Sequence, residues 1–533
     1  MSEDPKAKAV LERYNAMKSE RSTYENVWQD IRELIRPNTS DFQRRGSPGE
    51  VRTDRIYDGT APQALEDLAG ALHTYLTSPT ERWFALELEN EPELNREPEV
   101  VGWLEQVSDT IYKEYSKGNS GFNAAMHECY LDIGGFGNAV LNQEYDAGRR
   151  GLIFRDYPLN DCYAEEDAYG KIDTVARLLP MTPRQLVQLF NGAVPADVAA
   201  AKDRKYDVIH MVFPREDRVY GKSDAMNKAY ASCWVLKDKA ITLKEAGYDT
   251  FPYHVGRWSK IAGEIYGRGP AIKCLPDVRM LNRMELVIIK AAQKATDPPL
   301  VVPSDGFTMP IATSPGSLIF KEPGSEEIQS LEHKGNFPIA LETSEQKRNF
   351  IRQCFYADWV KLMPKKERQT AYEIAELVEQ QLRMMAPMLG RLETEFFSPM
   401  IARSYGLLLQ AGRFPEPPSL IERRALSVVY ISAASRAQTG TKAMAMGRFS
   451  QELLPLAQVK PDIVDAIDTD AFAQGLADIR GVSRRWLRSP RQIAEIRKAR
   501  AEQEQLAAAV EAIEPASQAV KNLSEANQAG NIF

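Results

Sequence analysis

Residues whose types and spacing could support catalysis are few in this sequence. Gly221-Lys222-Ser223 has the form of the end of a phosphate-binding loop, but Glu216 occupies the position where the partner glycine is needed. Without that glycine the backbone cannot wrap phosphates in the usual way, so a polar turn is the better interpretation. Gly134-Gly135-Phe136-Gly137 lacks the spacing of a dinucleotide-binding fingerprint and is typical of a helix end followed by a strand.

Metal and nucleophile chemistry is also poorly represented. One acidic cluster with a nearby lysine has the residue types of a metal-dependent nuclease site, but a solvated turn between strands explains it as well. It comprises Asp161, Glu165, Glu166, Asp167 and Lys171. The five histidines show no metal-ligand spacing, and no Gly-x-Ser-x-Gly elbow is present. The sequence therefore predicts no catalytic residue, no cofactor-binding residue and no metal ligand, and it does not indicate an enzyme.

Length and composition are those of a multidomain globular protein. The 533 residues exceed the roughly 250–300 at which single hydrophobic cores stop growing. No apolar run reaches the roughly 18–20 residues of a membrane span, and the first residues lack the apolar centre of a secretory signal. The five cysteines lie far apart without a Cys-x-x-Cys pair, which argues against disulfides and zinc and indicates maturation in a reducing cytoplasm.

The charge balance restricts how the chain can contact nucleic acid. It carries 67 basic and 74 acidic residues, a net charge of −7. A protein that grips DNA over its whole surface is normally basic. Any DNA contact must therefore be local or weak.

The first half of the chain predicts an α+β protein. Apolar residues near helical spacing predict a helix over 4–36, ended by Pro37, a second helix after Thr60 and another over 97–117. Alternating patterns predict strands at 83–88, 139–144, 152–157, 175–179, 208–213 and 233–236, with a short helix at 183–191. No β-α-β alternation points to a nucleotide-binding fold.

The middle of the chain reads as helix, compact insert and helix. The first helix, predicted over 277–296, carries four cations on one stripe: Arg279, Arg283, Lys290 and Lys294. Residues 298–338 contain seven prolines and four glycines, which predicts a small, turn-rich β insert. A second helix is predicted over about 342–362.

A basic break and a long helix follow. Residues 361–368 hold Lys361, Lys365, Lys366 and Arg368. Thr370 and Glu373 form a capping box that opens a helix ending near Gly412, with kinks expected at Pro387 and Pro399. One strand is predicted at 426–431, and helices are predicted from 442 to 513.

Several short motifs, taken in order, resemble the portal (head-to-tail connecting) proteins of short-tailed double-stranded DNA bacteriophages. The resemblance covers nearly the whole chain, and its specificity comes from the order of motifs that are individually weak. The motifs are Arg55-Ile56-Tyr57-Asp58, Leu76-Thr77-Ser78-Pro79, Trp83-Phe84, Phe251 to Trp258, Tyr266 to Pro270, Leu275-Pro276-Asp277, Glu367 to Ala371, Ser432 to Gln438, Gly481-Val482-Ser483 and Ser489-Pro490.

The resemblance implies a mainly helical α+β protein assembled as a ring, usually of twelve subunits, around a channel. Its regions would be an α/β wing (1–270 and 369–440), a two-helix stem (271–296 and 342–362), a β-containing clip (297–341), a channel loop (361–368) and a helical crown (441–533). Such a ring occupies one capsid vertex of the virion. It assembles in the bacterial cytoplasm with scaffolding and major capsid proteins, docks the terminase large subunit and holds tail adaptor proteins.

Three basic groups are candidates for contact with passing DNA. Twelve copies at −7 give roughly −84, which would keep a duplex centred while a few basic rings guide it. The 361–368 cations either line the narrowest part or form a solvated turn. The 279–294 stripe either faces DNA or pairs with acids of a neighbouring stem, such as Glu342 and Glu345. We favour the pairing with a neighbouring stem. The crown arginines contact either packaged DNA or acidic neighbouring residues; they are Arg484, Arg485, Arg488 and Arg491.

Two other functions compete with this interpretation. The first is another phage assembly scaffold or a tail adaptor, which the length and the helix–insert–helix core disfavour. The second is a DNA-processing enzyme such as a nuclease or a packaging ATPase. The missing phosphate-binding loop and metal cluster argue against that class.

Overall fold

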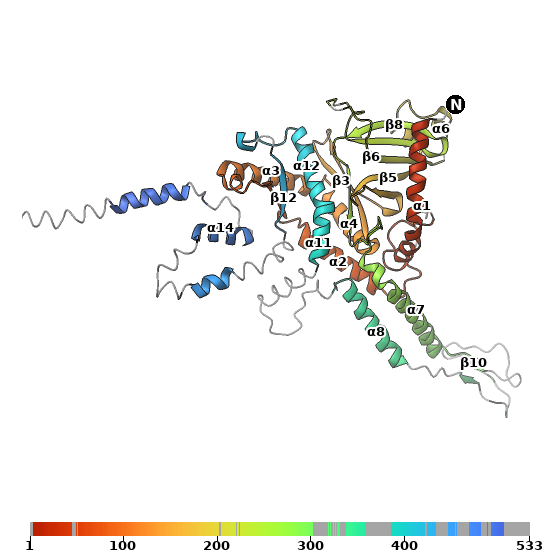
Figure 1. Ribbon diagram of the computed structural model, residues 1–533. Coiled ribbons are helices and arrows are strands. Elements are labelled where there is room, and N and C mark those ends of the chain that lie inside the picture. Colours follow the sequence, from red (N-terminus) through yellow and green to blue (C-terminus); the bar gives the residue numbers. More distant parts are fainter. Residues whose placement is uncertain are drawn as a thin grey trace, which may run out of the picture. The chain divides into compact units, whose positions relative to one another are not determined.

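The computed structural model contains helices and antiparallel sheets, as expected for an α+β chain (Figure 1). It describes residues 4–301 apart from 45–48, 51, 202–203, 220 and 223, then 337–357, 385–432 without 422–423, 446–453, 468–480 and 492–505, and the isolated positions 318, 320, 323–324, 326, 328–330, 455 and 488. The chain divides into two units. The first comprises residues 1–81 and 113–407, and the second 82–112 and 408–533.

Local capping sets the ends of several helices in the first unit. Helix α1 (Pro5–Leu34) begins after Asp4, whose carboxylate accepts the backbone N–H groups of Lys6 and Ala7. Helix α1 confirms the prediction for 4–36. The other helices that lie wholly within this unit are α2 (Thr60–Leu76), α4 (Phe122–Phe136), α5 (Pro183–Leu189), α6 (Ala196–Ala199), α7 (Pro270–Thr296), α8 (Phe337–Cys354) and α11 (Ala386–Leu392).

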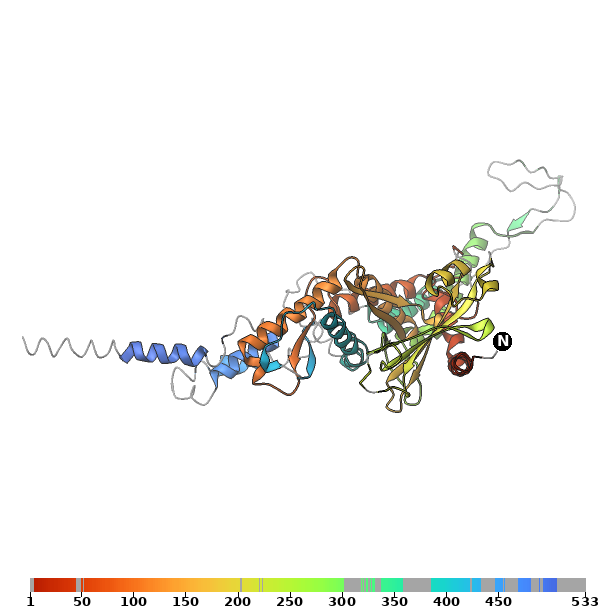
Figure 2. The same cartoon turned by 90° about the horizontal axis from the view of Figure 1, so that it is seen from above.

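The larger sheet of this unit is antiparallel, and α1 covers one of its faces (Figure 1, Figure 2). Its order is β4 (Cys162–Glu166), β5 (Ile172–Met181), β6 (Tyr206–Pro214), β7 (Tyr230–Leu236) and β8 (Ile241–Tyr248). On β6, Ile209 and Met211 pack against Val10 and Tyr14 of α1. Val208 packs with α5 and α6 instead, because successive strand residues face opposite sides.

The first unit also contains a second sheet, which has three antiparallel strands. Its order is β3 (Gly151–Tyr157), β2 (Asn138–Asp146) and β9 (Tyr253–Arg257). Buried polar residues tie it to helix α12 (Ser398–Gln410): the Gln143 amide donates to the Ser404 hydroxyl at 2.7 Å and contacts His254 at 2.9 Å. Burial lowers the pKa of His254 to about 3, so the imidazole is neutral.

The described part of the predicted long helix is interrupted. Between α11 and α12, residues Glu393–Phe397 form a π-helical segment whose Phe396 and Phe397 are buried. The helix ends at Gln410, close to the predicted end near Gly412. Its predicted start at Thr370 and Glu373 lies outside the described residues.

The second unit contains a two-stranded sheet, β1 (Phe84–Leu88) with β12 (Leu426–Tyr430), and most of helix α3 (Pro98–Ser116). The side chain of Asn95 pairs with both the N–H and the C=O of Leu88 and so caps the outer edge of β1. Helix α14 (Thr469–Arg480) and the helical residues 446–453 and 492–505 also belong to this unit.

The sheets agree with most sequence predictions. Each strand predicted from alternation is present, usually longer than predicted. Strands β4, β8 and β9 were not predicted. Between α7 and α8 in the chain, Leu300–Val301 (β10) pairs antiparallel with Gln329–Ser330 (β11).

Candidate functional site

Helices α7 and α8, which cover the two predicted stem helices, pack side by side (Figure 1). Apolar side chains are buried on both sides: Cys274 and Leu281 of α7, Ile351 of α8, and Phe355 directly after α8. Both helices begin earlier than predicted, α7 at Pro270 and α8 at Phe337. The first difference arises because Pro276, which resembles a helix start, lies inside α7.

Ion pairs link α8 to α7 and to the loop before α2. The Lys347 ammonium lies 2.7 Å from the Asp277 carboxylate. The Arg348 guanidinium lies 2.7 Å from Glu285 and 2.9 Å from Asp58, which precedes α2. The hydrogen bond to Asp58 raises the pKa of Arg348, and this effect is larger than the opposite effect of burying the Arg348 guanidinium. Arg348 therefore joins α8, α7 and the loop before α2.

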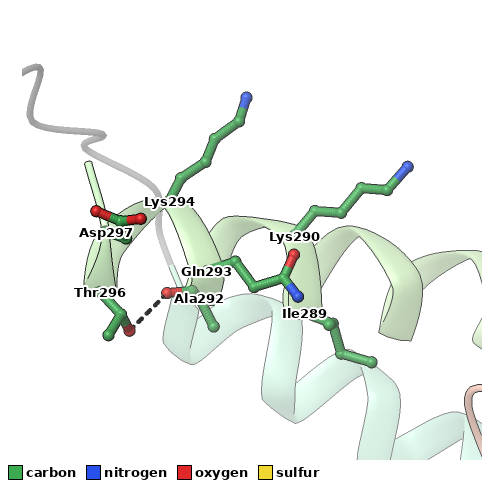
Figure 3. Close-up of a pocket in the computed structure, with 7 residues that line it drawn as sticks. All are labelled: Ile289, Lys290, Ala292, Gln293, Lys294, Thr296 and Asp297. Atoms are coloured by element: carbon green, nitrogen blue, oxygen red, sulfur yellow. Dashed lines mark hydrogen bonds between the residues drawn. The ribbon is translucent and has the colours of Figure 1, made fainter. Parts of the chain in front are cut away.

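The predicted basic stripe is present on α7 and is exposed. Arg279 forms an ion pair with Asp30 of α1. Figure 3 shows Lys290 and Lys294 pointing to the same side of α7, away from the neighbouring helix, where they border a surface pocket. No described residue forms an ion pair with Arg283, Lys290 or Lys294. Within the described part of the chain, three of the four cations therefore have no ion-pair partner.

The acids proposed as partners for this stripe differ in availability. Glu345 lies 3.3 Å from Arg348 and 3.2 Å from Arg352 of its own helix. Those hydrogen bonds lower the pKa of its carboxyl group. Glu342 is exposed, and no described residue pairs with it. Of these two acids, Glu342 is thus the one that no described residue pairs with.

Large apolar side chains also lie exposed on the stem. Met280 and Val287, seven residues apart on α7, share one side of that helix, and Val287 is 64% exposed. On α8 the exposed apolar residues include Ile339 and Phe350. Clustered exposed apolar side chains indicate a protein interface more often than scattered ones do.

Of the remaining predicted basic residues, the structure describes one, Arg488. The whole 361–368 segment, with Lys361, Lys365, Lys366 and Arg368, lies outside the described residues, as do Arg484, Arg485 and Arg491. Arg488 is described and exposed.

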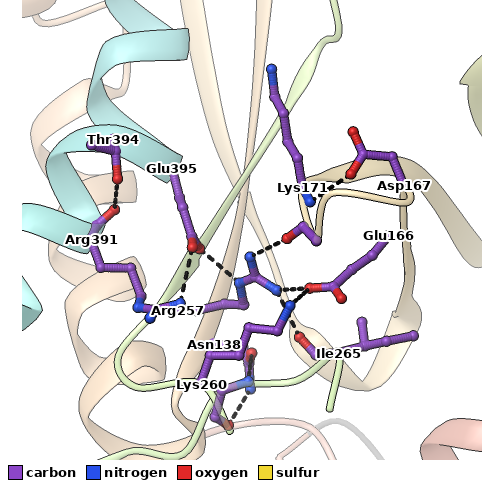
Figure 4. Close-up of polar contacts among 12 residues, drawn as sticks. Asn138, Glu166, Asp167, Lys171, Arg257, Lys260, Ile265, Arg391, Thr394 and Glu395 are labelled. Atoms are coloured by element: carbon purple, nitrogen blue, oxygen red, sulfur yellow. Dashed lines mark hydrogen bonds and ion pairs between the residues drawn. The ribbon is translucent and has the colours of Figure 1, made fainter. Parts of the chain in front are cut away.

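A buried arginine at the end of β9 joins β4 to the π-helical segment (Figure 4). Arg257, 1% exposed, pairs with Glu166 of β4 and, at 2.7 Å, with Glu395 of the π-helical segment. It also donates to the carbonyl groups of Ile265 and Gly170. Burial alone would lower the pKa of Arg257, but the two carboxylates raise it.

The backbone that leads from β9 into α7 lies against the turn between α4 and β2. Gly137 has φ +83°, and a Cβ there would lie 2.4 Å from the backbone nitrogen of Gly269. The Asn138 side chain accepts the N–H of Gly267 at 2.7 Å and donates to its carbonyl at 3.0 Å. The segment that leads into α7 is thus held closely against the start of β2.

The acidic cluster considered for nuclease chemistry serves structural contacts. Glu166 pairs with Arg257 and Lys260, and Glu165 pairs with Arg13 of α1. Asp167 accepts backbone N–H groups in the β4–β5 turn. Among the described residues, no group of three or more His, Cys, Asp or Glu is arranged to hold a metal ion, and no helix is long and apolar enough to cross a membrane.

Sequence reasoning missed the Arg257 cluster, although the motif that contains Arg257 was recognised. Its carboxylate partners lie 91 and 138 residues away in the chain. A cation within a short, otherwise apolar segment, Tyr253 to Trp258, was the available signal.

Comparison with known proteins identifies the family. The profile described as bacteriophage head to tail connecting protein matches residues 7–487. The chain is 30% identical to the "Probable portal protein" of Bordetella phage BPP-1, over 95% of this chain and 93% of that protein. It is 27% identical to the "Portal protein" of Salmonella phage epsilon15, over 97% and 95%. It is 22% identical to the "Portal protein" of Escherichia phage T7, over 77% and 76%. The chain therefore belongs to the family of bacteriophage head-to-tail connecting, or portal, proteins.

Proposed function

We propose that this portal protein assembles as a ring of twelve copies at one capsid vertex and forms the channel for packaging and ejecting double-stranded DNA. The observation that carries the proposal is the family match over residues 7–487, together with near full-length similarity to phage portal proteins. The exposed stem supports it, because a helix pair with apolar and cationic side chains facing solvent requires a partner.

In this ring the stem helices of adjacent copies pack side by side. The exposed Met280 and Val287 of one copy would contact Ile339 and Phe350 of the next. Val287→Glu tests this contact. Because Val287 is 64% exposed, we expect chain stability to change by less than about 0.5 kcal/mol while ring formation is lost. Val219→Glu, at a 51% exposed site away from the stem, is the control and should leave rings intact. Intact rings with Val287→Glu would refute the contact.

The stem cations are proposed to pair between subunits and not within one chain. Arg283, Lys290 and Lys294 would meet Glu342 of the adjacent copy, since Glu345 is already paired. Lys290→Glu and Glu342→Lys should each weaken the ring, and the double variant should restore it, because charge reversal on both sides re-forms the attraction. Native mass spectrometry measures the ring fraction. A double variant no better than either single one would contradict the pairing.

The channel itself is proposed to pass DNA without holding it. Twelve copies at −7 repel the duplex from the walls, and the basic 361–368 segment supplies local guidance. Replacing Lys361, Lys365, Lys366 and Arg368 together with alanine should reduce packaged DNA or its retention. Unchanged packaging and retention, measured as DNA per purified head, would remove this segment from the channel.

The partners follow from the position at the vertex. We propose docking of the terminase large subunit and of tail adaptor proteins, and assembly with scaffolding and major capsid proteins in the host cytoplasm. The clip, 297–341, is the proposed docking region. A ring with this region exchanged for that of a distant portal should keep its subunit number but lose binding to its own terminase in a pull-down. Retained binding would place docking elsewhere.

A further inference from the structure

A pocket within the first unit combines polar and aromatic walls and takes no part in the stem. Its volume is about 620 Å³. The walls come from the β4–β5 turn, the start of β7, the β8–β9 turn, β9 and the π-helical segment with α12. Tyr169, at the tip of the β4–β5 turn, lies at the rim and is almost fully exposed. All of these elements belong to one unit, so the pocket exists in a single chain.

Arg403 of α12 is a buried cation on this wall. Its side chain is 4% exposed, and no carboxylate lies within ion-pair distance among the described residues. Nε donates to the carbonyl of Gln143, and Nη1 donates to the carbonyl and hydroxyl of Thr250. Nη2 donates to no described atom. Nη2 is not among the buried side-chain atoms that lack a hydrogen-bond partner, so it is not sealed from solvent, and its two N–H groups are open to an acceptor in the pocket.

The other charges of the pocket leave a positive excess. Both acids are already paired: Glu395 with Arg257 and Arg391, and Asp249 with Lys228 at 3.0 Å. Lys171 forms no ion pair with a described residue. Figure 4 shows its side chain extending away from the Arg257 cluster, with only its backbone N–H on Asp167. Arg403 and Lys171 are therefore cations on one pocket that lack a carboxylate partner.

We propose that this pocket binds an oxyanion, a phosphate or carboxylate group carried by a larger ligand. Arg403 Nη2 donates to the oxyanion from the buried wall, and Lys171 adds a second charge at the mouth. Guanidinium groups suit both anions because their N–H groups form parallel hydrogen bonds to two oxygens. The aromatic residues Tyr230, Phe251 and Tyr253 leave room for a flat or apolar group attached to the anion.

Calorimetric titration of the full-length chain with inorganic phosphate and, separately, glutarate at constant ionic strength tests the site. We expect saturable binding of at least one anion with a Kd below about 10 mM. Tighter binding of phosphate assigns a phosphate-bearing ligand, and equal or tighter binding of glutarate assigns an acidic side chain. Lys171→Ala, an exposed change that should not disturb folding, should weaken binding about tenfold. Arg403→Lys should abolish it.

The control variant is Lys18→Ala, which removes an exposed lysine of α1 outside the pocket and should leave the Kd unchanged. If neither anion binds saturably, the proposal is wrong. Binding that Lys171→Ala and Arg403→Lys both leave intact means an adventitious ion only, and also overturns the site.

Discussion

Substitution of Arg257 by methionine tests how the wing is held to the long helix. The change removes the guanidinium but keeps an unbranched side chain of similar reach at a position that is 1% exposed. It breaks the ion pairs with Glu166 and Glu395 and leaves the carbonyl groups of Ile265 and Gly170 without a donor. No other residue replaces these four contacts together.

The expected magnitude follows from what each partner retains. Breaking a buried ion pair by removing one member typically costs about 3–5 kcal/mol. Here Glu166 keeps Lys260, and Glu395 keeps Arg391 at 3.1 Å, so neither carboxylate is left uncompensated. The cost should lie at the lower end, about 3 kcal/mol, which is roughly a 100-fold increase in local opening.

Hydrogen exchange read by mass spectrometry measures that opening directly. Peptides covering 160–172 and 393–403 should lose about two orders of magnitude of protection, while those of α1 change little. Arg268→Ala is the matched control: Arg268 pairs with Glu264 four residues away at a more exposed site. Surface pairs of this kind contribute about 0–1 kcal/mol. Equal exchange in Arg257→Met and Arg268→Ala would refute the reasoning.

Three further predictions concern stability. Gly137→Ala should lower the free energy of unfolding by about 3 kcal/mol or more, because the added Cβ would lie 2.4 Å from a backbone atom. Gly192 also has a positive φ but lies in open space, so Gly192→Ala should lower it by only about 1–2 kcal/mol. Urea denaturation measures both changes. His210 and His254 have pKa values lowered by burial to about 3, below about 6.5 in the unfolded chain. Unfolding therefore takes up protons below about pH 6.5, and stability falls as pH falls toward 3. His210→Gln or His254→Gln should each reduce the loss of stability between pH 6 and pH 5 by about 1.2 kcal/mol. An unchanged dependence of stability on pH would contradict burial of these histidines in the neutral form. Arg348→Ala should increase hydrogen exchange in α8 but not in α1; unchanged exchange in α8 would show that its ion pairs do not hold the stem.

Local signals were sufficient for most helices and for the alternating strands. Helix α1 could be predicted because its apolar residues keep helical spacing to Pro37, and β6 because its apolar residues alternate. Strands β8 and β9 were missed because they include the charged residues Glu245 and Arg257, whose ion-pair partners lie elsewhere in the chain. Pairing across the sheet, and not local propensity, makes these segments strands.

In the candidate site, too, local patterns could be predicted and contacts between distant segments could not. The basic stripe on α7 could be predicted because residues 4 and 7 apart share a helix face. The contact of Arg279 with Asp30 could not, because it depends on how α1 lies beside α7. Arg403 was not recognised either, since an arginine inside an amphipathic helix gives no sign of being buried without a carboxylate.

The measurement that tests the central claim most directly is native mass spectrometry of the purified chain, combined with end-on electron microscopy. A ring of twelve copies predicts a particle near twelve times 59.9 kDa with a central hole wide enough for a DNA duplex. A small closed oligomer without a pore, unchanged over a wide range of protein concentration, would contradict it.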